Sequence, residues 1–130
     1  MPDSVPPPAF EIVNYSRPAD SFEAILAHDL FHDAVVLGRE ALPVPIADGT
    51  WPHVTRNGSE VARREPTFTV VQPLQAIRMI ARTLAQYGER LETGDWIILG
   101  SLVQPIPIHV GDRFAADFGP LGRLTLDILG

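Results

Sequence analysis

Apolar residues occur along the chain in short runs that are separated by proline, glycine and charged residues. Such runs are typical of short strands rather than of a helical bundle. Residues 9–13 (AFEIV), 34–38 (AVVLG) and 67–71 (TFTVV) are rich in β-forming residues, and each predicts a strand. Asn57-Gly58, within RNGSEVARR, is a strong signal for a two-residue hairpin turn.

The C-terminal part of the chain continues this β pattern. Four apolar segments, broken by Gly-Asp and Gly-Pro pairs, predict further strands: DWIILGSL (95–102), IPIHV (106–110), RFAADF (113–118) and LTLDIL (124–129). The segment LPVPIADGTWPHV (42–54) alternates proline with aliphatic residues, which suits an edge strand or a loop.

Two segments instead follow a helical period. Residues 19–30 place Phe22, Ile25, Leu26 and Leu30 on one face, and Asp20 with Glu23 suggests a capping box. A clearer helix begins at Pro73 and ends before Gly88. Its buried stripe is predicted to consist of Leu74, Ile77, Ile80, Ala81 and Leu84.

The pattern as a whole predicts an α+β fold in which β-structure dominates. We expect a curled mixed sheet or β-roll with one or two helices packed on it. Residues 1–8 (MPDSVPPP) are expected to form an extended proline-rich arm, and residues 9–130 a single domain.

Composition narrows the function classes. The net charge of −6 argues against sequence-independent binding of nucleic acids, which requires a positive surface. The absence of cysteine excludes disulfides and thiolate chemistry. The N-terminus lacks the pattern of a secretory signal, and no apolar run approaches the roughly 20 residues of a membrane helix. We therefore expect a soluble cytoplasmic protein without a membrane partner.

Glu11 is the first candidate for chemistry, because it interrupts the apolar run of residues 9–13. A buried glutamate must be paired, protonated or bound to a metal. The alternative is a strand glutamate that reaches solvent at a sheet edge.

The segment HDLFHD (28–33) is the second candidate. On a helix, His28 and His32 would share one face and could chelate a divalent ion. The alternative is a solvated helix end, where histidines are favoured by the helix dipole.

Two further groups could contact a substrate. Gly100 and Ser101, followed by Leu102, would close an apolar strand and present an amide and a hydroxyl to a substrate oxygen. Arg17 could pair with Glu11 or hold an acidic substrate in a bidentate manner.

These segments, taken in order, resemble a known family. PAFEIV, VVLG, RNGSEV, LAQYGERLETGD and GDWIILGSLVQPIPIHVGDRFAADFGPLGRLTLDIL resemble the C-terminal half of the 2-keto-4-pentenoate hydratase and 4-oxalocrotonate decarboxylase group of the fumarylacetoacetate hydrolase superfamily. The resemblance extends over nearly all of the chain from Pro8 onward.

The resemblance implies a catalytic role for Glu11, which matches a glutamate that binds magnesium or manganese in that family. The family's Glu-x-Glu pair and catalytic lysine lie in an N-terminal half that has no counterpart here, so the implied metal site is incomplete. Departures also cluster near the expected site: Asn14 replaces an aspartate, Arg17 comes one residue late, and Phe31 and His32 stand where serines are usual.

Three hypotheses follow. The first is a truncated, altered enzyme (lyase, hydratase, isomerase or cyclase) that acts on a keto acid or β-dicarbonyl compound and need not depend on a metal. Its catalytic residues would be Glu11, His32 and Ser101, and its substrate contacts Arg17, Gly100 and Leu102. The second is a half-enzyme completed by another chain, and the third is a non-catalytic binding or scaffold protein. In each case a homo-oligomer or hetero-complex is expected, because the absent half would leave apolar surface exposed.

Overall fold

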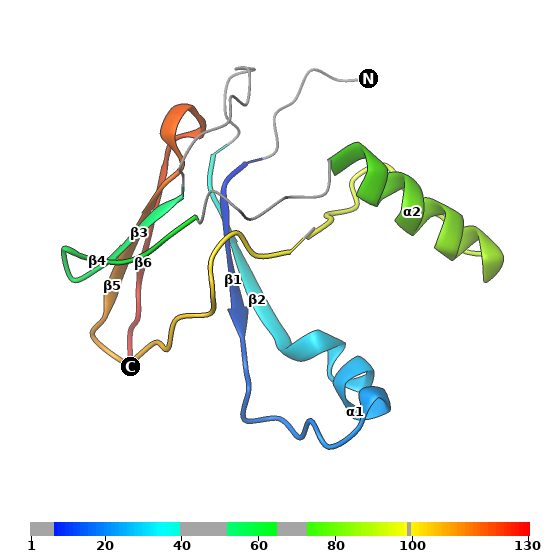
Figure 1. Cartoon of the computed structure of the whole chain (residues 1–130), viewed down its shortest axis with the longest axis horizontal. Coiled ribbons are helices and arrows are strands. Elements are labelled where there is room, and N and C mark those ends of the chain that lie inside the picture. The colour runs from blue at the N-terminus through cyan, green and yellow to red at the C-terminus, as the bar shows by residue number, and fades with distance from the viewer. Residues whose placement is uncertain (1–6, 40–51, 65–72, 99) are drawn as a thin grey trace.

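The computed structural model describes residues 7–39, 52–64, 73–98 and 100–130 as a strand-rich α+β arrangement (Figure 1). The predicted strand at 67–71 and nearly all of the predicted arm lie outside these residues, as does most of segment 42–54. The elements, in chain order, are β1 (Ala9–Val13), α1 (Phe22–Ala27), the 3₁₀ turn Asp29–Phe31, β2 (His32–Leu37), β3 (His53–Arg56), β4 (Ser59–Arg63), α2 (Pro73–Gln86), β5 (Arg113–Asp117), the 3₁₀ turn Gly119–Leu121 and β6 (Arg123–Asp127).

The strands form two antiparallel sheets, and the described residues do not close into a barrel. One sheet has four strands in the order β4-β3-β5-β6, and β1 and β2 form a separate two-stranded ribbon. The α+β prediction with β-structure dominant is therefore confirmed at this coarse level.

The core lies on one face of the four-stranded sheet. In the register of this sheet, Ala116 lies opposite Val54 on β3 and Leu124 on β6. Directly opposite residues of neighbouring strands project from the same face of a sheet, so these three side chains point the same way. They form the buried cluster together with Phe114 and Phe118.

The ribbon covers part of this core. Phe10 on β1 lies opposite Val36 on β2, and both side chains pack against the buried cluster. Because Phe10 faces the core, Glu11 on the same strand faces away from it.

The Asn57-Gly58 hairpin is confirmed between β3 and β4, with both residues at positive φ (52° and 84°). The Asn57 side chain fixes this turn to the start of β5. Its Nδ2 donates to Asp112 Oδ1 at 3.0 Å, and its Oδ1 accepts from the backbone N–H of Arg113 at 2.9 Å.

The first helix is shorter than predicted. Helix α1 ends at Ala27, and Ser21 rather than Asp20 caps it by accepting a hydrogen bond from the backbone N–H of Ala24 at 3.1 Å. The backbone then leaves the helical region, because Leu30 has φ 53° and ψ 33°. Leu30 therefore does not extend the apolar face of the helix.

Helix α2 has the predicted bounds, but its apolar stripe is not buried. Among the described residues, no strand or other helix packs extensively on it. Ile77, Ile80, Ala81 and Leu84 are only half-buried, and Met79 beside them is 64% exposed. The prediction that these residues pack on the sheet is thus wrong for the described part of the chain.

Two of the four predicted C-terminal strands do not form among the described residues. Strands β5 and β6 form where expected, but the described residues of 95–102 and 106–110 are irregular. Pro105 and Pro107 lack the backbone N–H that a strand ladder requires. Trp96 is 66% exposed, and among the described residues no strand pairs with its segment.

The Asn57–Asp112 contact predicts how the fold responds to acid. Burial alone would raise the pKa of Asp112, but hydrogen bonds from Asn57 and His109 and the charge of Arg56 outweigh it, so this pKa lies below its ordinary value of 3.8. A lowered pKa stabilises the fold at pH values above the unfolded-state pKa, and this stability is lost as the pH falls through the folded-state pKa. Asp112→Asn should therefore weaken the pH dependence of the unfolding free energy below about pH 4, as measured by urea denaturation between pH 2 and pH 6.

Asp20→Asn is the matched control, because Asp20 is exposed and has no hydrogen bond among the described residues. We expect it to leave the acid dependence unchanged. Equal acid dependence in Asp112→Asn and the unsubstituted chain would contradict the role given to this contact.

Candidate functional site

A carboxylate and an imidazole meet on the ribbon. Glu11 Oε1 on β1 lies 3.0 Å from His32 Nδ1 at the start of β2, although 21 residues separate them in sequence. Their side chains are 33% and 28% exposed, respectively. Glu11 is therefore paired and reaches solvent, and it is not the buried carboxylate that the apolar run suggested.

A β-bulge brings these two side chains together. Glu11 lies opposite Val35 and Ile12 opposite Ala34, but Val13 lies opposite His32 rather than Asp33. Asp33 is thus the extra residue of the bulge. Because side chains alternate along a strand, a regular ladder would place Asp33 on the face of Glu11 and turn His32 to the other face.

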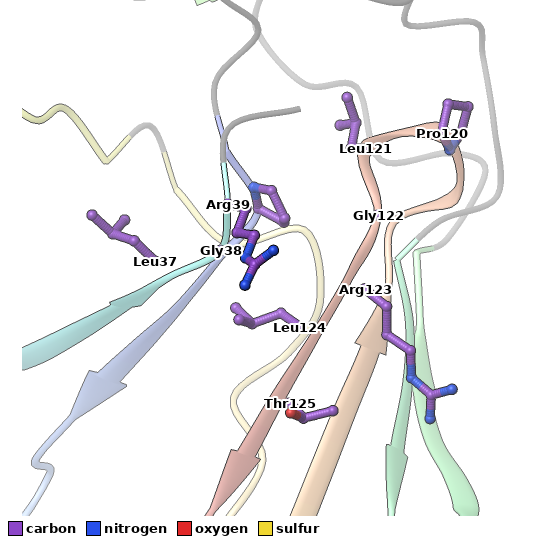
Figure 2. A pocket seen from close by; sticks show the side chains of 10 residues that line it. Leu37, Gly38, Arg39, Pro120, Leu121, Gly122, Arg123, Leu124 and Thr125 are labelled. Carbon is purple, nitrogen blue, oxygen red and sulfur yellow. The ribbon is translucent and has the colours of Figure 1, made fainter. Parts of the chain in front are cut away.

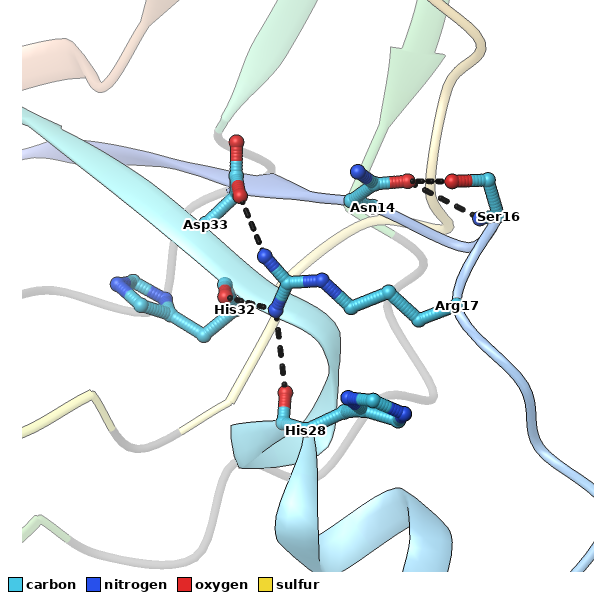
Figure 3. Close-up of polar contacts among 6 residues, drawn as sticks. All are labelled: Asn14, Ser16, Arg17, His28, His32 and Asp33. Atoms are coloured by element: carbon cyan, nitrogen blue, oxygen red, sulfur yellow. Dashed lines mark hydrogen bonds and ion pairs between the residues drawn. The ribbon is translucent and has the colours of Figure 1, made fainter.

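Arg17 binds both sides of the bulge. Its Nη1 donates to the carbonyl oxygens of His28 at 3.4 Å and His32 at 3.1 Å, and its Nη2 lies 2.7 Å from Asp33 Oδ1 (Figure 3). The prediction that Arg17 could pair with Glu11 is therefore wrong. The guanidinium that was expected to hold an acidic substrate instead binds the carbonyls and carboxylate of this chain.

The segment between His28 and His32 does not form the expected helix. Asp29, Leu30 and Phe31 have φ of 50°, 53° and 69°, a left-handed conformation that is rare for residues other than glycine. His28 follows the last residue of α1 as its C-cap, whereas His32 begins a strand, so the two imidazoles do not share a helix face as a metal-chelating pair would require.

Residues just before Arg17 support this left-handed turn. The backbone N–H of Asn14 donates to the carbonyl of Phe31 at 2.8 Å, and the Tyr15 ring packs edge-on against the Phe31 ring at 5.2 Å. Asn14 Oδ1 in turn accepts from the hydroxyl of Ser16 at 2.6 Å. The structure thus shows roles for Asn14 and Asp33 that the sequence did not reveal.

The predicted GSL segment lies in irregular backbone instead of closing a strand. Gly100 has φ 121°, and the Ser101 hydroxyl donates to the carbonyl of Val103 at 2.6 Å. The hydrogen bonds of the described residues do not connect Ser101 to Glu11 or His32. Within the described ranges, the backbone N–H groups of Gly100 and Leu102 have no hydrogen-bond partner.

The side chains around Glu11 do not provide the ligands for the magnesium or manganese ion that the family resemblance implies. Magnesium prefers several oxygen ligands in octahedral geometry. Across residues 7–39, 52–64, 73–98 and 100–130, no group of three or more histidine, aspartate or glutamate side chains is placed to hold a metal. At Glu11 only an imidazole stands beside the carboxylate, and Asp33 is bound to Arg17.

Two open clefts lie elsewhere on the described surface. One, of about 520 Å³, lies between the Pro8 end of the ribbon and the residues 120–125, and Figure 2 shows Arg39 and Leu124 at its wall. The other, of about 480 Å³, is lined by residues that include Arg56, Ile106 and His109. Neither cleft includes Glu11 or His32.

None of the described helices is long and apolar enough to cross a membrane.

Comparison with known proteins relates the chain to hydratases. It is 28% identical over 111 residues to the 2-oxo-hept-4-ene-1,7-dioate hydratase of Escherichia coli, an alignment that covers 84% of this chain and 41% of that protein. It is 38% identical over 70 residues to the TodF product hydratase of Pseudomonas putida, which covers 54% of this chain and 26% of that protein.

The chain spans less than half the length of each curated relative that it matches. No protein-family model matches the chain. Over most of its length, the chain is similar to part of these proteins named as hydratases.

Proposed function

We propose that this chain is a hydratase-like enzyme in which His32, oriented by Glu11, transfers protons to and from an enolisable 2-oxo acid or β-dicarbonyl compound. The observation that carries the proposal is the 3.0 Å contact between Glu11 Oε1 and His32 Nδ1 on the solvent-accessible face of the ribbon. The hydratase names of the two relatives support the reaction class.

The contact sets the chemistry of the imidazole. We propose that Nδ1 of His32 donates a hydrogen bond to the Glu11 carboxylate, because an ionised carboxylate only accepts hydrogen bonds. The lone pair of Nε2 is then available to accept a proton, which is the arrangement of a general base held by a carboxylate.

The proposed reaction step needs only the substrate, a water molecule and His32. Nε2 of His32 takes a proton from a water molecule whose oxygen forms a bond to the β-carbon of a C=C bond conjugated with the ketone. The π electrons move to give an enolate, and the imidazolium returns the proton to the α-carbon. In the reverse direction, the same residue removes the α-proton of a hydroxylated 2-oxo acid, and water leaves.

The substrate oxygens need donors, and Gly100 and Leu102 are proposed to supply them. Within the described ranges their backbone N–H groups have no partner, so both can donate to a ketone or carboxylate oxygen. Arg17 is not among the proposed substrate contacts, because Nη1 and Nη2 donate within the chain. The Ser101 hydroxyl donates to Val103 and retains only its capacity to accept.

The proposal predicts proton exchange at carbon. In D₂O the chain should catalyse the exchange of the α-protons of 2-oxobutanoate, followed by proton NMR. His32→Gln should slow this exchange by about 100-fold to 10,000-fold, the usual contribution of a general acid–base residue. His109→Gln is the matched control, because His109 is an exposed histidine outside the ribbon, and the substitution keeps its backbone bond to Asp112 while replacing a ring that lies 3.5 Å from Asp112 Oδ2.

No exchange above the rate in buffer would contradict the catalytic proposal. A non-catalytic binding or scaffold protein would then become the better account. Equal losses in His32→Gln and His109→Gln would instead show that the effect does not arise at the ribbon.

A second proposal concerns the partner, and it rests on α2. We propose that a second copy of this chain covers the apolar stripe of α2, which no described element packs on extensively. The charged residues of α2 are Arg78 and Arg82, whereas the chain as a whole carries a net charge of −6. An acidic partner, such as a second copy of this chain, complements these two arginines better than a basic protein would.

Sedimentation velocity tests this association. Ile80→Glu should shift a dimer toward monomer at micromolar concentration, whereas Gln75→Glu, on an exposed position of the same helix, should not. A monomer in the unsubstituted protein would contradict self-association through α2.

A further inference from the structure

We propose that Arg17 is a positioning residue whose guanidinium holds the β-bulge at Asp33 and thereby keeps His32 on the same face as Glu11. This inference concerns the site of the proposed function. It is tested by the structure of the ribbon, so it can fail or succeed independently of catalysis.

The ribbon has two possible registers at its end. In the observed register the bulge leaves Asp33 unpaired and places His32 opposite Val13. In the regular register Asp33 would lie opposite Val13, because Glu11 already lies opposite Val35 and Ile12 opposite Ala34. That one-residue difference would exchange the imidazole for a carboxylate on the face of Glu11.

Arg17 distinguishes between these registers through three contacts. It binds the Asp33 carboxylate at 2.7 Å and the His32 carbonyl at 3.1 Å, which are consecutive residues of the bulge. Its third contact, to the His28 carbonyl at 3.4 Å, spans the left-handed residues Asp29–Phe31. Charge-assisted hydrogen bonds from one planar group fix the three acceptors relative to one another.

The ion pair alone does not explain this effect. The side chains of Arg17 and Asp33 are 31% and 48% exposed, and pairs of this kind contribute little to stability. The two carbonyl contacts are the part that a simple charge cannot replace. A lysine at position 17 would keep the charge but lose the planar fork that spans these acceptors.

The backbone also needs such support. Left-handed conformations cost free energy for residues with side chains, and three occur in succession here. Among the described residues, the turn is also held by the Asn14 N–H to Phe31 carbonyl bond, by the backbone N–H groups of Phe31 and His32, which donate to the carbonyls of His28 and Asp29, and by the contact between the Tyr15 and Phe31 rings. Loss of Arg17 should therefore release the turn and the bulge together.

Solution NMR of the full chain tests this inference. The unsubstituted protein should show a nuclear Overhauser contact between the His32 ring and the Glu11 side chain. Arg17→Gln should lose it, and the amide of Asn14 should exchange with deuterium about tenfold to a hundredfold faster, as expected when charge-assisted bonds are lost. Arg90→Gln is the matched control, because it removes an exposed arginine that pairs only locally with Glu92.

Two further variants separate positioning from general stabilisation. Arg17→Lys should also lose the ring contact, because the fork is absent. Deletion of Asp33 removes the extra residue and makes the regular ladder place His32 on the face of Glu11. In this deletion background, Arg17→Gln should leave the contact intact.

The inference would be overturned if Arg17→Gln or Arg17→Lys kept both the ring contact and the Asn14 protection. It would also be overturned if Arg17→Gln removed the contact equally in the deletion background, since Arg17 would then act on the fold and not on the bulge. Should Arg17→Gln fail to fold, Arg17→Lys and the deletion pair carry the same comparison.

Discussion

Burial of Phe10 and Val36 against the buried cluster of the four-stranded sheet sets the register of the β1–β2 ribbon, and the rest of the site depends on that register. Once Phe10 faces the core, strand geometry turns Glu11 toward solvent. The apolar contact thus decides the direction of a carboxylate that takes no part in the contact. A shift of one residue in this register would bury Glu11 and expose Phe10.

The site also requires a departure from regular strand geometry. The bulge at Asp33 and the left-handed residues Asp29–Phe31 are both unfavourable in isolation. They persist because polar groups from residues 14–17 and the ring of Tyr15 bind to them. A strained segment that joins a helix to a strand and is held from outside is typical of sites where side chains must be placed against their local preference.

Much of the strand pattern could be predicted from sequence, because it depends on local rules. Apolar segments bounded by Gly-Asp and Gly-Pro pairs identified β5 and β6, and the Asn57-Gly58 pair identified the hairpin. The bounds of α2 followed from Pro73 and Gly88, but its packing did not, because amphipathicity indicates that a face should be covered without indicating by what. The irregular backbone at 106–110 could have been anticipated from Pro107 within it and Pro105 just before it.

The candidate site was predicted as separate residues and not as an arrangement. Glu11 and His32 were both recognised, yet their pairing depends on a bulge that has no sequence signature of its own. Arg17 was assigned to the substrate because a guanidinium suits a carboxylate, whereas its acceptors are two backbone carbonyls and Asp33. Backbone acceptors cannot be read from residue types, so this role depends on the three-dimensional structure.

The central claim is that Glu11 holds the imidazole of His32 with the proton on Nδ1. The most direct measurement is a ¹⁵N NMR spectrum of the His32 side chain, recorded at a pH where the ring is neutral, in the unsubstituted protein and in Glu11→Ala. The account predicts the Nδ1–H tautomer in the unsubstituted protein and its loss in Glu11→Ala. An Nε2–H tautomer, or identical spectra in the two proteins, would contradict the account.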